Sequence, residues 1–365
     1  MRGRGIVFTG PQQAELEPVE VDAADLRPGE VLVRAQYSII SAGTEGSFYT
    51  NLMAEVPPIY RPRPVIYPAR TGYGHLGEVV AVGPFIGGTP TGGTESSPGK
   101  QGPTPGQRVL SFSRHAAVVR CNAARFAMPV PATADGRRVV FTRMAGVAIT
   151  ALRASSASAG DTVAVIGLGL VGNLAAQLFQ LAGCSVIAFD LSPRRLELAR
   201  ACGVHNVHHA GEVDPVEVTR SWVGAADERG GARIVVEAIG RSELVAQAVE
   251  MAGRHGEVVL LGSPRAPHSA DVTPMLGRIH LLAIKLIGAL EWTYPIAEDT
   301  ERARHTIAAN YRQILDWILA GRLVVDPLRT HVLPPDRCQE AYAGLAHRPD
   351  DYLGVVFDWT GETPS

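Results

Sequence analysis

Residues 162–190 read TVAVIGLGLVGNLAAQLFQLAGCSVIAFD, and this stretch decides the fold. The apolar run TVAVI is followed by the glycine-rich segment GLGLVG (167–172), by helically spaced apolar residues up to 183, and by a second apolar run, SVIAFD. A GxGxxG segment that follows a strand and opens a helix is typical of a dinucleotide-binding turn. The stretch therefore predicts a β-α-β unit that binds a dinucleotide.

Each glycine of this turn has a separate expected role. Gly167 allows the tight turn, Gly169 lets the backbone approach a pyrophosphate, and Gly172 lets the helix pack closely on the strand. The helix then begins with Leu170 and Val171, whose segment offers amide donors and the positive end of the helix dipole to the phosphates.

Asp190 ends the second strand, where a carboxylate can accept hydrogen bonds from the adenosine ribose hydroxyls. Because a carboxylate repels a 2′-phosphate, NAD(H) is favoured as the cofactor over NADP(H). Arg194 and Arg195 follow closely and could favour the phosphate, so NADP(H) stays the alternative.

The chain on either side of this unit shows two different sequence patterns. Strands and helices continue to alternate through RIVVEAIG (233–240), ELVAQAVEMAG (243–253) and EVVLLG (257–262), which predicts a doubly wound parallel sheet in an α/β fold. The first 125 or so residues carry short β-type runs such as 30–40, 77–83 and 107–112, and the end carries a long helix at 300–321 and a strand GVVFDW. We expect the dinucleotide-binding domain to span 144–288 and a β-rich substrate domain to combine 1–143 with 289–365.

Composition excludes several classes of protein. The 365 residues carry a net charge of −2, so no basic face for nucleic acid is expected. No run of 18 apolar residues and no signal-like start is present, which predicts a cytoplasmic protein with no membrane partner. The cysteines are scattered without a CxxC pair, against a disulfide framework or a structural zinc lobe: Cys121, Cys184, Cys202 and Cys338. The Gly/Pro-rich stretch 84–106 is expected to be a mobile surface loop.

Several segments together resemble the medium-chain dehydrogenase/reductase superfamily over essentially the whole chain. They are PGEVLVRAQYS (28–38), GEVVAVG (77–83), PGQRV (105–109), AGDTVAVIGLGLVG (159–172) and LAGRLVVDPLRTHVLP (319–334). The resemblance implies a Rossmann domain plus a GroES-like catalytic domain, with a small-molecule substrate bound between them, hydride transfer at nicotinamide, and homodimers or homotetramers. The segments SAGTE (41–45) and GYxxxGEVVxVG (72–83) are similar to the corresponding sequences of the bacteriochlorophyllide a dehydrogenase-like subgroup.

The same resemblance implies that catalytic zinc is absent. In zinc-dependent members, cysteine, histidine and glutamate stand where this chain has Ala42, Tyr73 and Gly74, and a third ligand falls near Thr142. Zinc needs three protein N, S or O ligands. His75 would be a lone imidazole, so we expect it to be a packing histidine and expect no metal site.

Without zinc, another group must polarise and protonate the substrate oxygen. Tyr73 is the leading candidate, since it occupies a ligand position facing the nicotinamide in the resembled fold; the alternative is a ring that only fills space. Thr44 matches a relay hydroxyl, and His115 is expected to border the substrate pocket and to act on the substrate. Glu45 is expected to be a structural hydrogen-bond acceptor.

Other site residues are also implied by the match. Ser192 and Arg195 fall near the adenosine ribose, and Arg241 flanks the adenine. Residues expected to border the nicotinamide half are Ile239, Gly262 and Ala289. The arginines of YRPRPVIYPAR, which are Arg61, Arg63 and Arg70, are either solvated surface groups or contacts to an anionic substrate. EWTYP (291–295) could line the pocket or a subunit contact.

Three functions remain open at this stage. The first is an NAD(P)-dependent oxidoreductase acting on CH–OH donors without zinc, on a cyclitol, sugar-like or other specialised metabolite. The second is a zinc-free C=C reductase of the quinone or enoyl type, which the preference of Asp190 for NAD(H) disfavours. The third is a non-catalytic dinucleotide-binding protein, which retention of Thr44 disfavours.

Overall fold

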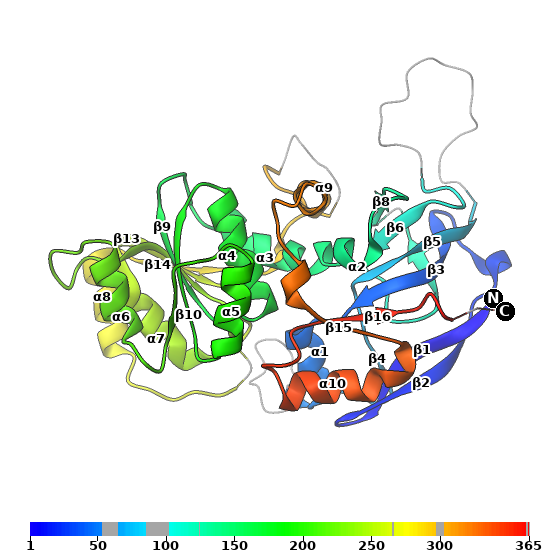
Figure 1. Cartoon of the computed structure of the whole chain (residues 1–365), viewed down its shortest axis with the longest axis horizontal. Coiled ribbons are helices and arrows are strands. Elements are labelled where there is room, and N and C mark those ends of the chain that lie inside the picture. The colour runs from blue at the N-terminus through cyan, green and yellow to red at the C-terminus, as the bar shows by residue number, and fades with distance from the viewer. Residues whose placement is uncertain are drawn as a thin grey trace, which may run out of the picture.

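The computed structural model describes residues 1–52, 65–84, 102–123, 125–264, 266–296, 303–362 and 364. Figure 1 shows a sheet wrapped by helices on one side of the molecule and a β-rich part on the other, with both chain ends close together at the far edge of the β-rich part. None of the described helices has the length and apolarity needed to cross a membrane. The predicted segments 53–64 and 85–101 lie outside the described residues, and with them Arg61, Arg63 and most of the Gly/Pro-rich stretch.

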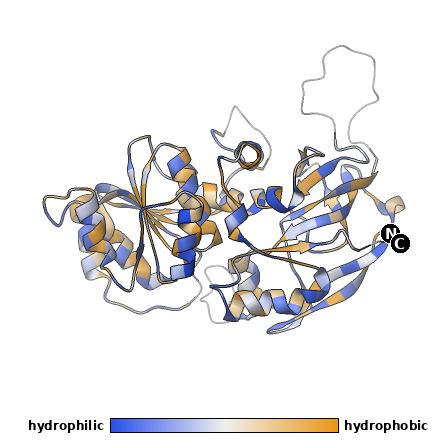
Figure 2. Cartoon of the chain, in the orientation of Figure 1, coloured by the Kyte–Doolittle hydropathy of each residue, from blue (hydrophilic) through white to orange (hydrophobic). Residues whose placement is uncertain are grey.

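The first sheet has six parallel strands in the order β11-β10-β9-β12-β13-β14. Its strands are β9 (Thr162–Ile166), β10 (Ser185–Asp190), β11 (Val207–His209), β12 (Ala232–Glu237), β13 (Ala252–Leu260) and β14 (Lys285–Gly288). The chain starts in the middle, builds outward to β11, and returns to build the other half from β12, which is the Rossmann strand order. Figure 2 colours much of these central strands as hydrophobic, as burial on both faces requires.

Helices cover both faces of this sheet. They are α4 (Leu170–Leu181), α5 (Pro193–Ala201), α6 (Pro215–Trp222), α7 (Ser242–Met251) and α8 (Thr273–Leu282). α4 and α5 pack with one set of buried side chains, and α6, α7 and α8 with another, as their opposite positions in Figure 1 show. The sequence did not lead us to expect β11, α6, α8 or β14; β11 and β14 are only three and four residues long.

The β-rich part contains two further sheets. The larger has the order β15-β16-β3-β5-β6-β8, with β7 also paired to β3, and the smaller is β2-β1-β4. Their strands are β1 (Arg2–Gly10), β2 (Gln13–Glu20), β3 (Glu30–Ile39), β4 (Ala69–Arg70), β5 (His75–Val82), β6 (Arg108–Ser111), β7 (Val118–Asn122), β8 (Ala127–Val130), β15 (Arg329–Leu333) and β16 (Gly354–Asp358). The predicted α/β class with a second, β-rich part is therefore confirmed.

The remaining helices position the site. They are α1 (Ala42–Tyr49), α2 (Gly136–Val139), α3 (Thr142–Ala154), α9 (Ile307–Leu319) and α10 (Cys338–His347), with single 3-10 turns at η1 (Ala23–Asp25), η4 (Glu291–Thr293), η5 (Asp326–Leu328) and η6 (Pro335–Arg337). α3 packs against both α4 and α9 and lies between the two parts of the molecule (Figure 1). The helix predicted over 300–321 appears as α9, shorter at both ends among the residues described.

Candidate functional site

The glycine-rich turn lies where the strand order of the parallel sheet reverses, between β9 and β12. Ligands of such sheets bind outside the carboxyl ends of the strands at this point. Gly167 follows β9 with φ of 94°, a left-handed conformation that favours glycine. The side chain of Ile239, which follows β12, lies over it: a Cβ on Gly167 would come 2.4 Å from Ile239 Cγ1.

The other two glycines of the turn differ in what surrounds them. A Cβ on Gly172 would lie 2.0 Å from the carbonyl oxygen of Gly167, so helix α4 can approach the turn only without a side chain there. A Cβ on Gly169 would meet no protein atom within 4 Å, and its φ of −57° suits any residue. Protein packing thus explains Gly172, whereas the space at Gly169 suits a ligand at the start of α4, whose first amides have no acceptor within the helix. This geometry fits a dinucleotide pyrophosphate.

Asp190 holds the loops at the ends of β9 and β10 together. Its carboxylate accepts hydrogen bonds from the amides of Leu168, at 2.7 Å, and Ser192, at 2.9 Å. The Arg195 guanidinium lies 3.7 Å from Asp190 and donates to the Pro349 carbonyl at 3.2 Å, so it also touches the C-terminal part of the chain. Since a carboxylate has about four acceptor positions, Asp190 keeps capacity for ribose hydroxyls.

The other predicted cofactor residues surround the same end of the sheet with separate structural tasks. Ser192 accepts a hydrogen bond from the amide of Arg195 and caps α5, while the exposed Arg241 pairs with Glu243 at the start of α7. Gly262 meets Gly240, because a Cβ there would lie 2.1 Å from the Gly240 nitrogen. The Ala289 carbonyl accepts from the Thr150 hydroxyl of α3 at 3.2 Å.

A pocket of about 330 Å³ lies beside Tyr73. Its wall is aromatic and its rim carries two arginines; the lining residues are Tyr73, Phe112, Ser113, Arg120, Cys121, Asn122, Arg125, Phe126 and Trp292. The stretch EWTYP thus lines the pocket through Trp292. Arg70, in contrast, pairs with Glu17, with Nη2 at 2.8 Å from the carboxylate, and does not line this pocket.

The Tyr73 hydroxyl lies in a group of three hydroxyls. It is hydrogen-bonded to Ser41 and, at 3.2 Å, to Thr44, both at the start of α1. A phenol has one proton, so Tyr73 can donate to one of these partners and accept from the other. Burial raises the pKa of the Tyr73 hydroxyl, and the charge of Arg143 with the two hydroxyl contacts offsets part of that rise. The structure therefore brings together two of the predicted catalytic candidates, Tyr73 and Thr44.

His115 does not border this pocket, contrary to expectation. Its side chain is fully buried, and its ring nitrogens lie 2.7 Å from Ser38 Oγ and 3.0 Å from Glu45 Oε2. Gly72 makes room for His115, since a Cβ on Gly72 would come 2.5 Å from the backbone nitrogen of His115 and 2.7 Å from its ring. The strand pattern around residue 115 could not reveal which neighbours would cover the imidazole.

Glu45 is the centre of this buried network, as the predicted structural acceptor. Its carboxylate accepts from His115, from the Thr71 and Tyr342 hydroxyls, and from the Ser41 amide at 2.8 Å. Burial alone would raise the pKa of Glu45, but His115 and these hydrogen bonds lower it on balance. Through Ser41 the network fixes the backbone that carries a partner of the Tyr73 hydroxyl.

His75 is a buried packing residue on β5. Its Nε2 lies 3.3 Å from the Ala116 carbonyl, and its Nδ1 has no hydrogen-bond partner among the described residues. Burial lowers the pKa of His75 to about 4. No group of three or more His, Cys, Asp and Glu side chains suited to a metal occurs in the described ranges.

The pKa of His75 leads to a stability prediction. Because the folded pKa lies below the unfolded value of 6.5, the unfolded chain binds the proton first, and stability falls as pH drops from 6.5 toward 4. His75→Gln, which keeps an N–H donor, should remove about 2 kcal/mol of the loss between pH 7 and pH 4.5. Denaturant unfolding of both proteins at pH 7 and pH 4.5 measures it; parallel losses in both proteins would contradict it.

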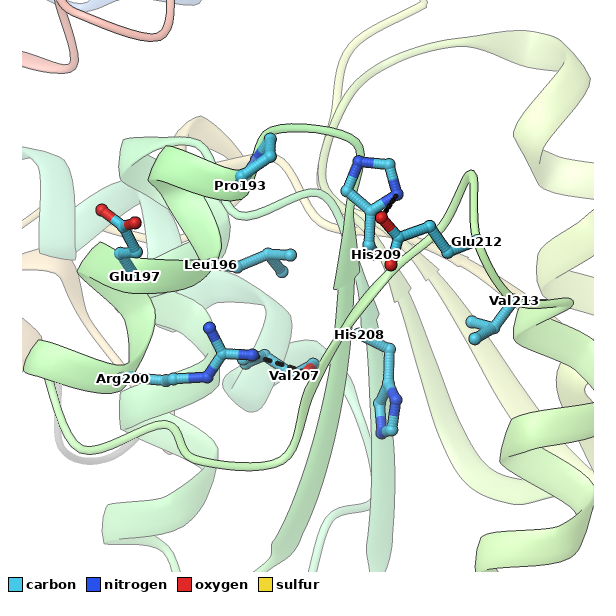
Figure 3. A pocket seen from close by; sticks show the side chains of 9 residues that line it. All are labelled: Pro193, Leu196, Glu197, Arg200, Val207, His208, His209, Glu212 and Val213. Carbon is cyan, nitrogen blue, oxygen red and sulfur yellow. Dashed lines mark hydrogen bonds and ion pairs between the residues drawn. The ribbon is translucent and has the colours of Figure 1, made fainter.

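A second hollow, of about 340 Å³, lies between α5 and the end of β11 (Figure 3). Its polar groups include His209 and Glu212, whose Nδ1 and Oε1 are 3.9 Å apart. It lacks an aromatic wall and shares no residue with the glycine-rich turn. Chemistry rather than size therefore makes the Tyr73 pocket the candidate site.

Sequence reasoning missed one charged residue here, Arg143 of α3, which is buried behind Tyr73. Its only signal was a basic residue within the apolar stretch VVFTRMAGVAI (139–149). A pattern of that kind does not say which side chains bury the charge.

Comparisons with known proteins give a consistent picture. Residues 171–302 match the family model of zinc-binding dehydrogenases. A 2-desacetyl-2-hydroxyethyl bacteriochlorophyllide A dehydrogenase of Cereibacter sphaeroides is 27% identical over 98% of this chain and 99% of its own length. Galactitol-1-phosphate dehydrogenase of Escherichia coli has the same fold, with a TM-score of 0.77 at 17% identity over 97% of this chain and 99% of its own. A zinc-binding dehydrogenase of Sinorhizobium meliloti, solved with bound NADP, gives 0.74 at 19% identity over 98% and 99% of the two chains.

Proposed function

We infer that this chain belongs to the medium-chain dehydrogenase/reductase superfamily, and from that premise we propose that it is an NAD(H)-dependent oxidoreductase that interconverts an alcohol and a ketone without catalytic zinc. The observation that carries the proposal is the Tyr73 hydroxyl, held by Ser41 and Thr44 beside an aromatic pocket. The dinucleotide supplies or accepts the hydride when bound at the glycine-rich turn.

The protein residues do the rest of the chemistry. In the direction of reduction, the Tyr73 hydroxyl donates its proton to the substrate oxygen as the carbonyl becomes an alcohol. Thr44 and Ser41 then return a proton to the phenolate from the solvent side. His115 does not contact the substrate. It is hydrogen-bonded to Glu45, whose carboxylate in turn accepts a hydrogen bond from the Ser41 amide.

The residues around Tyr73 do not fit a zinc ion. The positions that match zinc ligands carry a methyl group, a phenol and no side chain at Ala42, Tyr73 and Gly74. Thr142 is buried, and its hydroxyl has no hydrogen-bond partner among the described residues. The guanidinium of Arg143 also lies 4.4 Å from the centre of the Tyr73 ring, and a fixed cation there repels a divalent metal.

The pocket favours a substrate with a ring to stack and an anionic group. Phe112, Phe126 and Trp292 supply aromatic faces, and Arg120 and Arg125 supply positive charge at the rim. A specialised metabolite that carries a ring and an anionic group besides its secondary alcohol meets both conditions. The relative from Cereibacter sphaeroides is named for a hydroxyethyl derivative of bacteriochlorophyllide A.

The test is a nicotinamide absorbance assay with a panel of secondary alcohols, ketones and enones and with both cofactors. Turnover of alcohols and ketones with NAD(H) supports the proposal. Turnover of enones alone would assign a C=C reductase instead, and dinucleotide binding with no turnover on any class would leave a non-catalytic binding protein.

Asp190 is expected to set the cofactor preference. Asp190→Asn removes the charge and keeps one acceptor oxygen, so one of the two backbone amides also loses its partner. NADH affinity should fall roughly 10-fold while NADPH affinity falls less or rises. Fluorescence titration with each cofactor measures both Kd values. Equal losses would show that Asp190 only holds the loop, and Arg195 would then become the residue facing the ribose.

We also propose a homodimer formed along β14. This strand ends the parallel sheet, so one row of its backbone groups has no partner strand within the described residues, and Leu281, Leu286 and Leu290 near it are exposed. Leu286→Lys should give monomers in sedimentation velocity. Leu319→Lys, on α9 with the same exposed fraction (43% against 42%), is the control and should leave the dimer intact.

A cytoplasmic location completes the proposal. All four cysteines are buried and unpaired, as a reducing compartment allows.

A further inference from the structure

Arg143 is a buried cation with a complete set of partners. Its side chain is 1% exposed, and Nη2 lies 2.7 Å from the Glu291 carboxylate. Nη1 donates to Glu291 at 2.9 Å and to the Tyr311 hydroxyl, and Nε donates to the Tyr73 carbonyl at 3.1 Å. Burial would lower the pKa of Arg143, but Tyr311, Glu291 and Tyr73 raise it on balance, so the group stays charged.

Aromatic rings enclose this cation. The guanidinium carbon lies 4.4, 5.2, 5.3 and 5.9 Å from the ring centres of, in order, Tyr73, Phe112, Trp292 and Tyr311. The first three rings also line the pocket. The positive charge therefore lies directly behind the pocket wall, and closest to the proposed proton donor.

Two glycines create the space for this arrangement. A Cβ on Gly74 would lie 2.9 Å from Arg143 Cγ, so the stem of the arginine fills the room that a side chain at residue 74 would need. A Cβ on Gly146 would lie 2.2 Å from the Tyr311 ring, although a glycine inside a helix costs about 1 kcal/mol relative to alanine. The absence of a side chain at residue 74 is therefore one of the conditions that allow Arg143 to be buried here.

We propose that Arg143 is a positioning residue for proton transfer, whose fixed charge stabilises the Tyr73 phenolate that forms when the hydroxyl protonates the substrate oxygen. The inference rests on the proposed function of Tyr73. In reduction, the Tyr73 O–H bond breaks and an O–H bond forms on the substrate, which leaves the negative charge on Tyr73; a solvent proton passed through Ser41 or Thr44 restores the phenol. Oxidation runs the same proton path backward.

The charges that face Tyr73 come from every element around it. Glu45 on α1 opposes the phenolate, and Glu291 on η4 and Tyr311 on α9 share the charge of Arg143. Arg120 and Arg125 line the same pocket and are exposed. Arg143 is therefore the one buried cation beside Tyr73 among the described residues, and Glu291 partly offsets it.

This balance gives two variants with opposite expected shifts. Glu291→Gln keeps an acceptor for Arg143 and Tyr311 but removes the negative charge, so the pKa of Tyr73 should fall by about 1 unit. The double variant Arg143→Met/Glu291→Gln removes the pair together, which avoids leaving a buried unpaired carboxylate, and the pKa should rise by about 1 unit. Arg143→Lys keeps the charge and should stay close to the parent.

The phenol is titrated by ultraviolet difference absorbance, with the curve of Tyr73→Phe subtracted, and in parallel the pH profile of kcat is recorded. We expect the pKa of Tyr73 to shift in opposite directions in the two variants. The pH profile of kcat should shift in the same direction as the titration in each variant. Unmoved titrations in folded Glu291→Gln and Arg143→Met/Glu291→Gln proteins would overturn the inference and leave Arg143 as a packing element. Shifts in the titration without turnover on any substrate would instead overturn the proposed function, because the titration needs no substrate.

Discussion

We expect Tyr73→Phe to lower kcat about 100-fold or more and to leave the Kd for NADH unchanged. The variant removes only the hydroxyl, which is hydrogen-bonded to Ser41 and Thr44, and leaves the ring that packs on Arg143. The pocket wall therefore stays in place while the proton donor is lost. Steady-state kinetics in the direction of ketone reduction, together with NADH titration, separate the two effects.

A matched variant controls for the loss of a tyrosine hydroxyl in general. Tyr352→Phe removes a hydroxyl that contacts Glu340 and Arg348, outside the pocket, and should leave kcat unchanged. If Tyr73→Phe turns over as fast as Tyr352→Phe, Tyr73 fills space and the acid lies elsewhere.

The second large effect concerns two glycines three residues apart. Gly169→Val should weaken NADH binding roughly 10- to 100-fold while the free energy of unfolding changes little, because the new side chain meets no protein atom near its Cβ. Gly172→Ala should instead lower the free energy of unfolding by about 3 kcal/mol, since its Cβ lies 2.0 Å from the Gly167 oxygen.

Denaturant unfolding and NADH titration on both variants check this contrast. Each variant is the control for the other, since they lie on the same turn. If Gly169→Val kept full NADH affinity, the pyrophosphate would not lie against this turn. If Gly172→Ala were as stable as the parent, the backbone of α4 or of the turn would be able to shift away from the added methyl group at little cost in free energy.

The dinucleotide part of the fold could be predicted because its signals are local. The strand, the three glycines and the following helix of residues 162–183 lie next to one another in the chain, and Asp190 follows at the end of the next strand. Each residue there has a role set by the backbone turn itself. The short β11 and the edge strand β14 escaped prediction because three- and four-residue strands carry too little pattern.

The catalytic side was harder to predict because its contacts are distant in the chain. Arg143 is enclosed by rings from residues 73, 112, 292 and 311, which only the tertiary fold brings together. His115 was expected in the pocket, but Ser38 and Glu45 hold it in the interior. Tyr73 and Thr44 were each named as candidates from the family resemblance, whereas their contact with each other and with Ser41 was not predicted.

The most direct test of the central claim is the zinc content per subunit of catalytically active protein, measured by elemental mass spectrometry after purification without chelators or a metal-affinity tag. The account predicts a value near zero, with Tyr73 and Arg143 in place of the metal. A value near one would contradict it and return the chemistry to a metal site that the residues around Tyr73 do not reveal.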